Sequence, residues 1–262
     1  SYIAAPRGRT ICRECLDQLV PIHGPRCFKC SKPLMGSEAE YCHDCASKKH
    51  SYDRGISIFS YGSVLSKSLY QLKIIKGRSN GHFYGRYAAA CAGEQIRLWG
   101  VEVLIPVLFI QKEWKKEDNQ AEIIAREIGR ILRIPVDTKT VIRKINNKAQ
   151  KELNAKERRI NLRSAFAVTL PKLPWKKILI IDDIYTTGST VDGVSLALKA
   201  AGAEQVYFLT IAIGQVSADK ALIRLLYLAI MQVVYIGWHV RRVFAPCCFR
   251  CHKTVRLYSP GI

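Results

Sequence analysis

The sequence predicts an α/β fold, a parallel sheet with helices on both faces, preceded by a small metal-binding segment. Strand-like and helix-like patterns alternate from residue 56 to residue 212, as in βα units whose strands pair in parallel. Within this alternation, the four aliphatic residues 178–181 are typical of a buried strand that leads into a turn and a helix. Three C-x-x-C pairs in the first 52 residues predict the metal-binding segment.

The first half of the alternation predicts two strands and two helices. Residues 56–61 alternate as in a strand, and residues 64–75 repeat leucines at helical spacing. A loop is expected at residues 77–81, and residues 103–107 form the next strand. The helix between them is expected to bury a stripe that consists of Tyr84, Tyr87, Ala88, Cys91, Gln95 and Leu98.

The second half continues the same order. Asn119 is a suitable N-cap for a helix whose apolar stripe begins at Ala121. The helix that follows the central strand buries Val191, Val194 and Leu198 and ends at Gly202. The remaining expected elements are a short strand at 136–142, a polar, partly helical segment at 144–164, the central strand at 178–181 and a last strand at 206–212.

The central strand leads directly into two carboxylates and a turn rich in Thr, Gly and Ser. Ligands of open α/β sheets bind outside the carboxyl ends of the strands. Carboxylates accept hydrogen bonds from ribose hydroxyls, and the turn with the following helix N-terminus offers N–H groups to a phosphate. The pattern is neither a Walker A loop nor a dinucleotide fingerprint. It predicts a sugar-phosphate site rather than an ordinary capped corner, with candidates Asp182, Asp183, Thr186, Thr187, Gly188, Ser189 and Thr190.

Residues 178–190 resemble the binding motif for 5-phosphoribosyl 1-pyrophosphate (PRPP) of type I phosphoribosyltransferases. Residues 10–214 resemble the ComF/GntX family, which joins zinc ribbons to such a domain and is linked to competence and DNA use. The further matching positions are the cysteine pairs before Tyr52 and Asp53, Leu72 with Lys73 and Lys76, the Asn-Gln-Ala-Glu run from Asn119, and Gln150, Leu153, Glu157, Arg158, Asn161 and Phe166.

The resemblance implies a type I phosphoribosyltransferase-like fold and a Mg²⁺-dependent transfer in which a nitrogen nucleophile displaces pyrophosphate from PRPP. Asp182 and Asp183 would be the catalytic pair that holds the ribose hydroxyls, and residues 186–190 would bind the 5′-phosphate. Lys73 and Lys76 are further PRPP-binding candidates. Positioning and charge stabilisation would supply most of the catalysis.

A non-catalytic alternative comes from the segment before Asn119. Where the resembling family has Gly and Phe in an Arg-rich loop, this chain has Glu117 and Asp118. Two acids beside an anion site repel pyrophosphate, although Lys115 and Lys116 compensate in part. The alternative is a nucleic-acid or protein adaptor in DNA uptake that retains a ribose-phosphate pocket. The two readings are compatible, because one protein can bind both PRPP and single-stranded DNA.

The cysteine pairs predict structural zinc. Two C-x-x-C turns complete a tetrahedral site, and the eleven-residue spacer between the second and third pairs suits a zinc ribbon. A disulfide framework is disfavoured because no secretory segment precedes the pairs, and His43 and His50 are taken as surface residues. The candidates are Cys27, Cys30, Cys42 and Cys45 for one ion, and Cys12 and Cys15 for a second, completed by an upstream knuckle or by Cys248 and Cys251.

Composition indicates the partners. The net charge of +20 and the pI of about 9.7 favour polyanions, either nucleic acid or a phosphorylated substrate. Together with the family resemblance, which implies a link to competence, this makes single-stranded DNA and competence-machinery proteins the partners expected beside PRPP, in a cytoplasmic protein. The expected divisions are a zinc-ribbon domain at 1–52, a phosphoribosyltransferase-like domain at 53–215 and an atypical tail at 216–262. The apolar run 225–238 is shorter than the roughly 20 residues that span a bilayer. A docking helix is preferred over a membrane-surface helix, and a tail without selected function is a third alternative.

Overall fold

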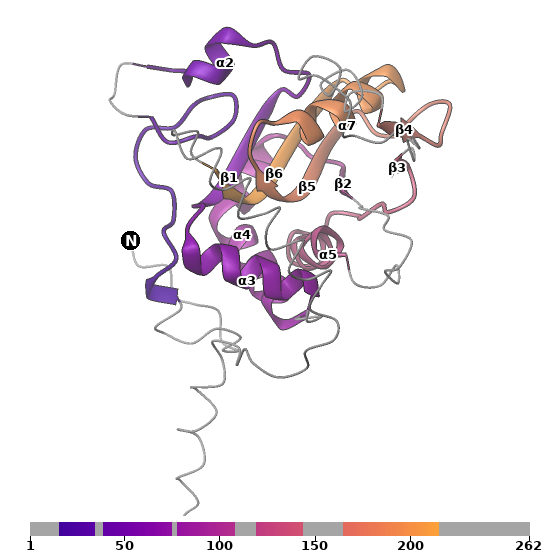
Figure 1. Cartoon of the computed structure of the whole chain (residues 1–262). Coiled ribbons are helices and arrows are strands. Elements are labelled where there is room, and N and C mark those ends of the chain that lie inside the picture. Colours follow the sequence, from indigo (N-terminus) through magenta and orange to yellow (C-terminus); the bar gives the residue numbers. More distant parts are fainter. Residues whose placement is uncertain (1–15, 35–38, 75–77, 108–118, 144–164, 215–262) are drawn as a thin grey trace, which may run out of the picture.

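The computed structural model describes residues 16–34, 39–74, 78–107, 119–143 and 165–214 (Figure 1). Helices and strands alternate along these residues, as the sequence predicts. The elements are α2 (His43–Ser47), β1 (Arg54–Ser60), α3 (Ser63–Ile74), α4 (Arg78–Leu98), β2 (Val103–Pro106), α5 (Gln120–Leu132), β3 (Val141–Arg143), β4 (Phe166–Val168), β5 (Lys177–Tyr185), α7 (Ser189–Ala200) and β6 (Gln205–Ile213).

The main sheet has four parallel strands in the order β1-β6-β5-β2. Residues 178–181 of β5 are fully buried, because β2 and β6 flank the strand and helices cover both faces. The predicted central strand is therefore confirmed, but it continues four residues further, to Tyr185. Asp182 pairs with Thr210 of β6, so the first carboxylate lies within the strand and not in the turn.

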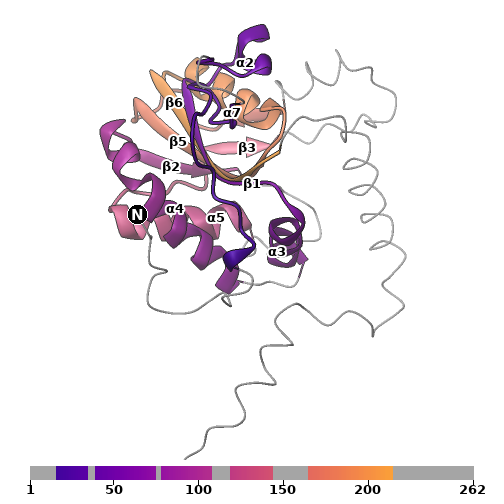
Figure 2. The same cartoon turned by 90° about the vertical axis from the view of Figure 1, so that its left-hand side faces the viewer.

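Helices lie on both faces of this sheet, as predicted: α3, α4 and α5 on one face and α7 on the other (Figures 1 and 2). Two separate hydrophobic clusters result. Leu179 and Ile181 belong to the cluster with α4 and α5, and Ile178 and Ile180 belong to the cluster with α7. Side chains alternate between faces along a strand, so a continuous aliphatic run supplies both clusters. The second cluster also includes Cys27, Cys30 and Cys42, which places the cysteine-rich segment on the α7 side.

The two helix ends predicted at Asn119 and Gly202 are confirmed. The side-chain oxygen of Asn119 accepts a hydrogen bond from the backbone N–H of Glu122 at 3.3 Å, which caps α5. Gly202 follows the last residues of α7 with φ of +104°, a conformation that favours glycine. The inward residues Val191, Val194 and Leu198 of α7 are buried, as expected.

Two expectations for α4 are wrong. The helix begins at Arg78, so residues 78–81 are helical and not part of a loop. Its buried face runs through Tyr84, Ala88, Ala92 and Ile96, whereas Cys91 is exposed and Leu98 is 75% exposed. The buried face was assigned wrongly because alanines produce no strong apolar stripe in the sequence. These small residues nevertheless allow α5 to pack closely against α4. A Cβ on Gly85 would lie 2.6 Å from Cβ of Glu127 in α5.

The short strand predicted at 136–142 is reduced to β3, which pairs with β4 in a separate two-stranded antiparallel sheet. The expectations for residues 144–164, for Glu117 and Asp118 and for the tail at 216–262 lie outside the described residues. Among the helices that the structure describes, none combines the length and apolar character needed to cross a bilayer.

Candidate functional site: the β5–α7 corner and the cysteine cluster

The corner between β5 and α7 carries the predicted sugar-phosphate residues. Gly188 precedes the first helical residue and has φ of +76°, in the left-handed region. The N–H of Asp192 donates to the carbonyl of Gly188 at 2.8 Å and so makes the first helical hydrogen bond. The N–H groups of Ser189, Thr190 and Val191 precede that bond and face the end of the helix, where the helix dipole favours an anion.

Gly188 also makes a close approach that no other residue permits. A Cβ at this position would lie 2.6 Å from the hydroxyl oxygen of Tyr185 and 2.9 Å from its Cζ. Tyr185 is itself 4% exposed, so its ring cannot move into solvent without exposing apolar surface. The turn therefore needs glycine both for its backbone angle and for its contact.

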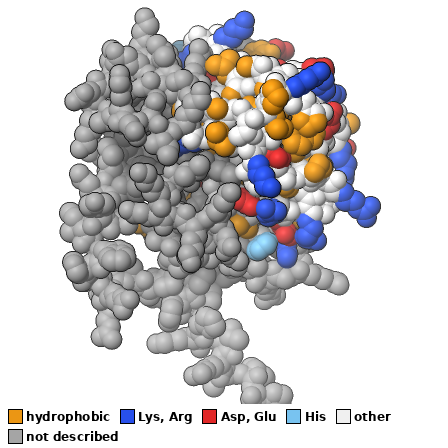
Figure 3. Space-filling view, turned by 90° about the vertical axis from the view of Figure 1, so that its right-hand side faces the viewer, with side chains coloured by type: hydrophobic (Ala, Val, Ile, Leu, Met, Phe, Trp, Pro, Cys, Tyr) orange, Lys and Arg blue, Asp and Glu red, His pale blue; other side chains and the backbone are white. Residues whose placement is uncertain are grey.

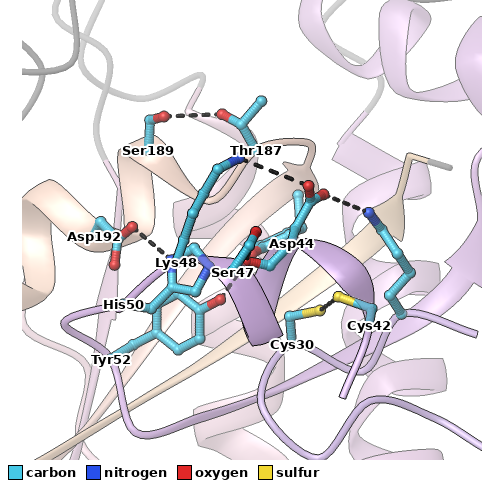
Figure 4. A network of polar contacts seen from close by, with 12 residues as sticks. Cys30, Cys42, Asp44, Ser47, Lys48, His50, Tyr52, Thr187, Ser189 and Asp192 are labelled. Carbon is cyan, nitrogen blue, oxygen red and sulfur yellow. Dashed lines mark hydrogen bonds and ion pairs between the residues drawn. The ribbon is translucent and has the colours of Figure 1, made fainter. Parts of the chain in front are cut away.

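The hydroxyl residues of the turn differ in exposure. Thr186 and Thr187 are exposed, and Ser189 and Thr190 are half-buried. The hydroxyls of Thr187 and Ser189 lie 2.9 Å apart and form a hydrogen bond across the turn (Figure 4). These hydroxyls are available to an anion at the helix N-terminus.

The two carboxylates lie directly before the turn and are held by the backbone. Asp182 is 3% exposed, and its Oδ1 accepts a hydrogen bond from the N–H of Asp183 at 2.9 Å. Asp183 is half-buried, and its Oδ1 accepts from the N–H of Ile184 at 2.8 Å. Such local bonds restrict the side-chain rotamers, so the acids are oriented before any ligand arrives. Of the remaining PRPP candidates, Lys73 belongs to α3 and Lys76 lies outside the described residues.

The second candidate site is the cysteine cluster. The Sγ atoms of Cys27, Cys30, Cys42 and Cys45 all lie within 4.8 Å of one another. A tetrahedral zinc ion with Zn–S bonds of about 2.3 Å separates its sulfurs by about 3.8 Å, so a small contraction completes the site. The four residues therefore fit structural zinc, as predicted. Cys12 and Cys15, the candidates for a second ion, lie outside the described residues.

Backbone geometry and proton sharing prepare the cluster for a metal. The N–H of Ser31 donates to the carbonyl of Cys27 at 2.9 Å and closes the first C-x-x-C turn. Hydrogen bonds from the thiols of Cys30 and Cys45 lower the pKa of Cys27, and the bond to Cys27 raises the pKa of Cys30. Zinc binds cysteine as thiolate, so zinc binding displaces the thiol protons of the cluster.

The sequence did not predict the side-chain contacts that join the β5–α7 corner to the cysteine-rich segment. His50, expected at the surface, is 9% exposed, and its Nδ1 lies 2.7 Å from Oδ2 of Asp192 in α7 (Figure 4). The hydroxyl of Tyr52 lies 2.7 Å from that of Tyr185. The only signal available was the position of Tyr52 in the resembling family, because the partners are more than 130 residues away along the chain.

Lys and Arg side chains form no single patch on the face of the described residues that Figure 3 shows. Blue Lys and Arg side chains alternate there with red Asp and Glu side chains. A hollow between α4 and α5, with a volume of about 540 Å³, contains Arg86, Arg97 and Arg130 among its lining residues. Two of these arginines bind Glu127, so their charges are partly neutralised.

Comparison with known proteins agrees with this arrangement. Residues 3–46 match the double zinc ribbon domain, and residues 105–225 match the phosphoribosyl transferase domain. Competence protein F of Haemophilus influenzae is 29% identical over 208 residues, which cover 75% of this chain and 87% of that protein. DNA utilization protein YhgH of Escherichia coli strain K12 is 28% identical over 185 residues, covering 69% of this chain and 80% of that protein.

Two more distant proteins are also similar. Competence protein ComFC of Bacillus subtilis is 22% identical over 201 residues, covering 73% of this chain and 79% of that protein. A purine phosphoribosyltransferase of Pyrococcus horikoshii matches with a TM-score of 0.33 and 20% identity, covering 50% of this chain and 73% of that chain. The chain thus matches a double zinc ribbon domain followed by a phosphoribosyl transferase domain, and it is similar to proteins named for competence and DNA utilisation, as its motifs indicated.

Proposed function

We propose that the β5–α7 corner binds PRPP together with Mg²⁺ and that the chain is a phosphoribosyltransferase in DNA utilisation. The observation that carries this proposal is the conformation of Gly188, which has a positive φ and packs against Tyr185. This turn places the N-terminal amides of α7 a few residues after two carboxylates that are already oriented. An ordinary strand–helix corner has no need of this combination. The match to the phosphoribosyl transferase domain supports this class of ligand, and the names of the relatives support the link to DNA utilisation.

Each part of the corner has a distinct role in this proposal. Asp182 and Asp183 accept hydrogen bonds from the ribose hydroxyls and hold the sugar in one orientation. The amides and hydroxyls of residues 186–190 bind the 5′-phosphate, assisted by the dipole of α7. When bound, Mg²⁺ supplies positive charge to the pyrophosphate oxygens, which makes them a better leaving group.

The proposal is tested by calorimetry with PRPP in millimolar Mg²⁺. Intact protein is expected to bind, and the double variant Asp182→Asn/Asp183→Asn is expected to lose at least ten-fold in affinity. Glu204→Gln is the control, because this 63%-exposed acid pairs with Lys176 at the amino ends of β5 and β6, whereas the turn follows the carboxyl end of β5. Absence of binding heat from the intact protein at millimolar PRPP would reject the proposal, as would equal losses in the two variants.

A second candidate function is single-stranded DNA binding, with or without transfer chemistry. It is favoured by the net charge of +20 and by relatives named for competence and DNA utilisation. Binding should weaken steeply with salt, because counterions are released from the phosphates. Titration of a labelled oligonucleotide at 50 and 200 mM salt measures this dependence, and a lack of binding at 50 mM would exclude the function.

A further inference from the structure

We propose that the zinc ribbon positions the phosphate-binding turn through His50, Ser51 and Tyr52, so that zinc in the cysteine cluster sets the geometry of the amides at 186–191. This inference rests on the proposed function for its effect on PRPP. The positioning itself is a property of the protein without ligand. It makes the ribbon a part of the sugar-phosphate site and not an independent appendage.

The first connection is a two-point contact on Asp192. This residue lies in the first turn of α7 and is 8% exposed. Its Oδ2 lies 2.7 Å from Nδ1 of His50, and its Oδ1 accepts a hydrogen bond from the N–H of Ser51 at 2.7 Å. Both carboxylate oxygens are thus bound by residues 50 and 51, which directly follow the ribbon. The two contacts restrict rotation and translation of the helical turn that carries the free amides.

The second connection holds the ring beneath Gly188. The hydroxyls of Tyr52 and Tyr185 share a buried hydrogen bond of 2.7 Å. Tyr185 in turn sets the approach of Gly188, since its hydroxyl occupies the space that a Cβ would need. Tyr52 therefore acts on the turn through Tyr185.

Aromatic packing makes the two connections one rigid unit. The rings of His50 and Tyr52 stack with centroids 4.9 Å apart, and those of Tyr185 and Phe208 stack at 5.0 Å. Tyr52 also meets Phe208 edge to face at 4.9 Å. Because these rings are buried against one another, displacement of one requires displacement of the others.

The cysteine cluster is continuous with this unit. Cys27, Cys30 and Cys42 lie in the same buried hydrophobic cluster as Tyr52 and Tyr185. The short α2 begins directly after Cys42, contains Cys45 and ends at Ser47, three residues before His50. The ribbon contains few aliphatic residues, so zinc supplies much of its folding free energy. Loss of zinc therefore releases His50 and Tyr52, and the turn loses both supports.

Hydrogen–deuterium exchange on the full-length, zinc-loaded protein tests this inference without any ligand. His50→Phe retains the stacked ring but removes the contact with Asp192, and Tyr52→Phe removes only the hydroxyl. Each variant is expected to raise the exchange rate of amides 186–191 about ten-fold, and the double variant Cys30→Ser/Cys42→Ser, which cannot hold zinc in this cluster, is expected to raise it further. Calorimetry should show weaker PRPP binding in the same order.

The matched control is Lys199→Met, which breaks an ion pair of 2.8 Å with Asp53 at the other end of α7 and should leave amides 186–191 unchanged. Exchange in α5 reports global unfolding and should be unchanged in both aromatic variants. Unchanged exchange at 186–191 in both variants and in the cysteine double variant would overturn the inference. An intact protein that binds no PRPP would reject the proposed function, while the exchange rates would still decide the positioning.

Discussion

The Cα of Gly188 packs so closely against the ring of Tyr185 that a Cβ would lie 2.6 Å from the tyrosine hydroxyl oxygen. The same hydroxyl is bound by Tyr52 at the end of the cysteine-rich segment. The turn proposed to bind phosphate is thus shaped by a buried side chain of β5, and that side chain is held from outside the sheet. This relationship leads to the first prediction.

Gly188→Ala should destabilise the protein and weaken PRPP binding at least ten-fold. The left-handed φ alone costs about 1–2 kcal/mol for a residue with a Cβ, and the contact with Tyr185 adds a displacement of a buried ring. The matched control is Gly202→Ala at the other end of α7, where φ is +104° but no atom lies within 4 Å of the added Cβ. Urea unfolding should show a larger loss for Gly188→Ala, and equal losses would contradict the packing argument.

The zinc content should depend on the four clustered cysteines and not on the exposed Cys91. Cys30→Ser/Cys42→Ser is expected to lose one zinc ion per chain relative to the intact protein and to unfold at lower temperature, because the remaining thiols cannot complete the tetrahedron. Cys91→Ser is the control, since Cys91 is exposed and lies in α4. Elemental analysis and thermal scans measure both effects. Equal zinc content in the two variants would refute the assigned ligands.

Glu127 should make stability depend on pH in the acid range. Hydrogen bonds from Arg130 and Arg86, at 2.8 Å each, lower its pKa from 4.5 to about 2. A lowered carboxyl pKa stabilises the fold above the unfolded value of 4.5, and this contribution is lost as the pH falls toward 2. Glu127→Gln should therefore cost on the order of 2 kcal/mol at pH 7, and the difference from the intact protein should narrow below pH 4.5.

The control for this experiment is Glu122→Gln on the same helix. Glu122 pairs with Arg126, whose side chain is 61% exposed, so its loss should cost no more than about 0.5 kcal/mol. Urea unfolding from pH 7 to pH 3 compares the two variants, and loss of zinc at low pH affects both alike. A gap between Glu127→Gln and the intact protein that stays constant down to pH 3 would contradict the assignment.

The buried hydroxyls of Ser57 and Thr210 should behave as one unit. They lie 2.8 Å apart on neighbouring residues of β1 and β6, and both are fully buried. Ser57→Ala or Thr210→Val alone leaves one hydroxyl without its partner and should cost about 1–3 kcal/mol. The double variant should cost less than the sum, which a double-mutant cycle from urea unfolding measures. Additive losses would show that the two hydroxyls are independent.

Local sequence patterns were sufficient for the parts of the fold that depend on neighbours along the chain. The cap at Asn119 and the helix end at Gly202 involve residues three or four positions apart, and the structure confirms both. The strand at 178–181 was recognised because a parallel strand buried on both faces needs apolar residues at every position. The cysteine spacing likewise indicated a cluster that the structure assembles.

The buried face of α4 was beyond those patterns. Its alanines and its mixture of aromatic residues are compatible with two adjacent faces, and Cys91 was assigned to the wrong one. The close approach of α5 at Gly85 selects the actual face, and that approach is a property of two helices rather than of one. The central strand was also predicted too short. A prediction from hydrophobic residues ends the strand before the two acids, whereas pairing with β6 extends β5 through them.

The sequence by itself determined the order of the elements, the cysteine cluster and the corner where a sugar phosphate is proposed to bind, since each follows from residues close together in the chain. Only the tertiary structure decided that the cysteine-rich segment supports that corner. His50 meets Asp192 and Tyr52 meets Tyr185 across 142 and 133 positions, respectively. Contacts at that separation exist only after the sheet has formed, because β6 pairs with both β1 and β5 and so brings the segment before β1 to the same side of the sheet as Tyr185 and α7.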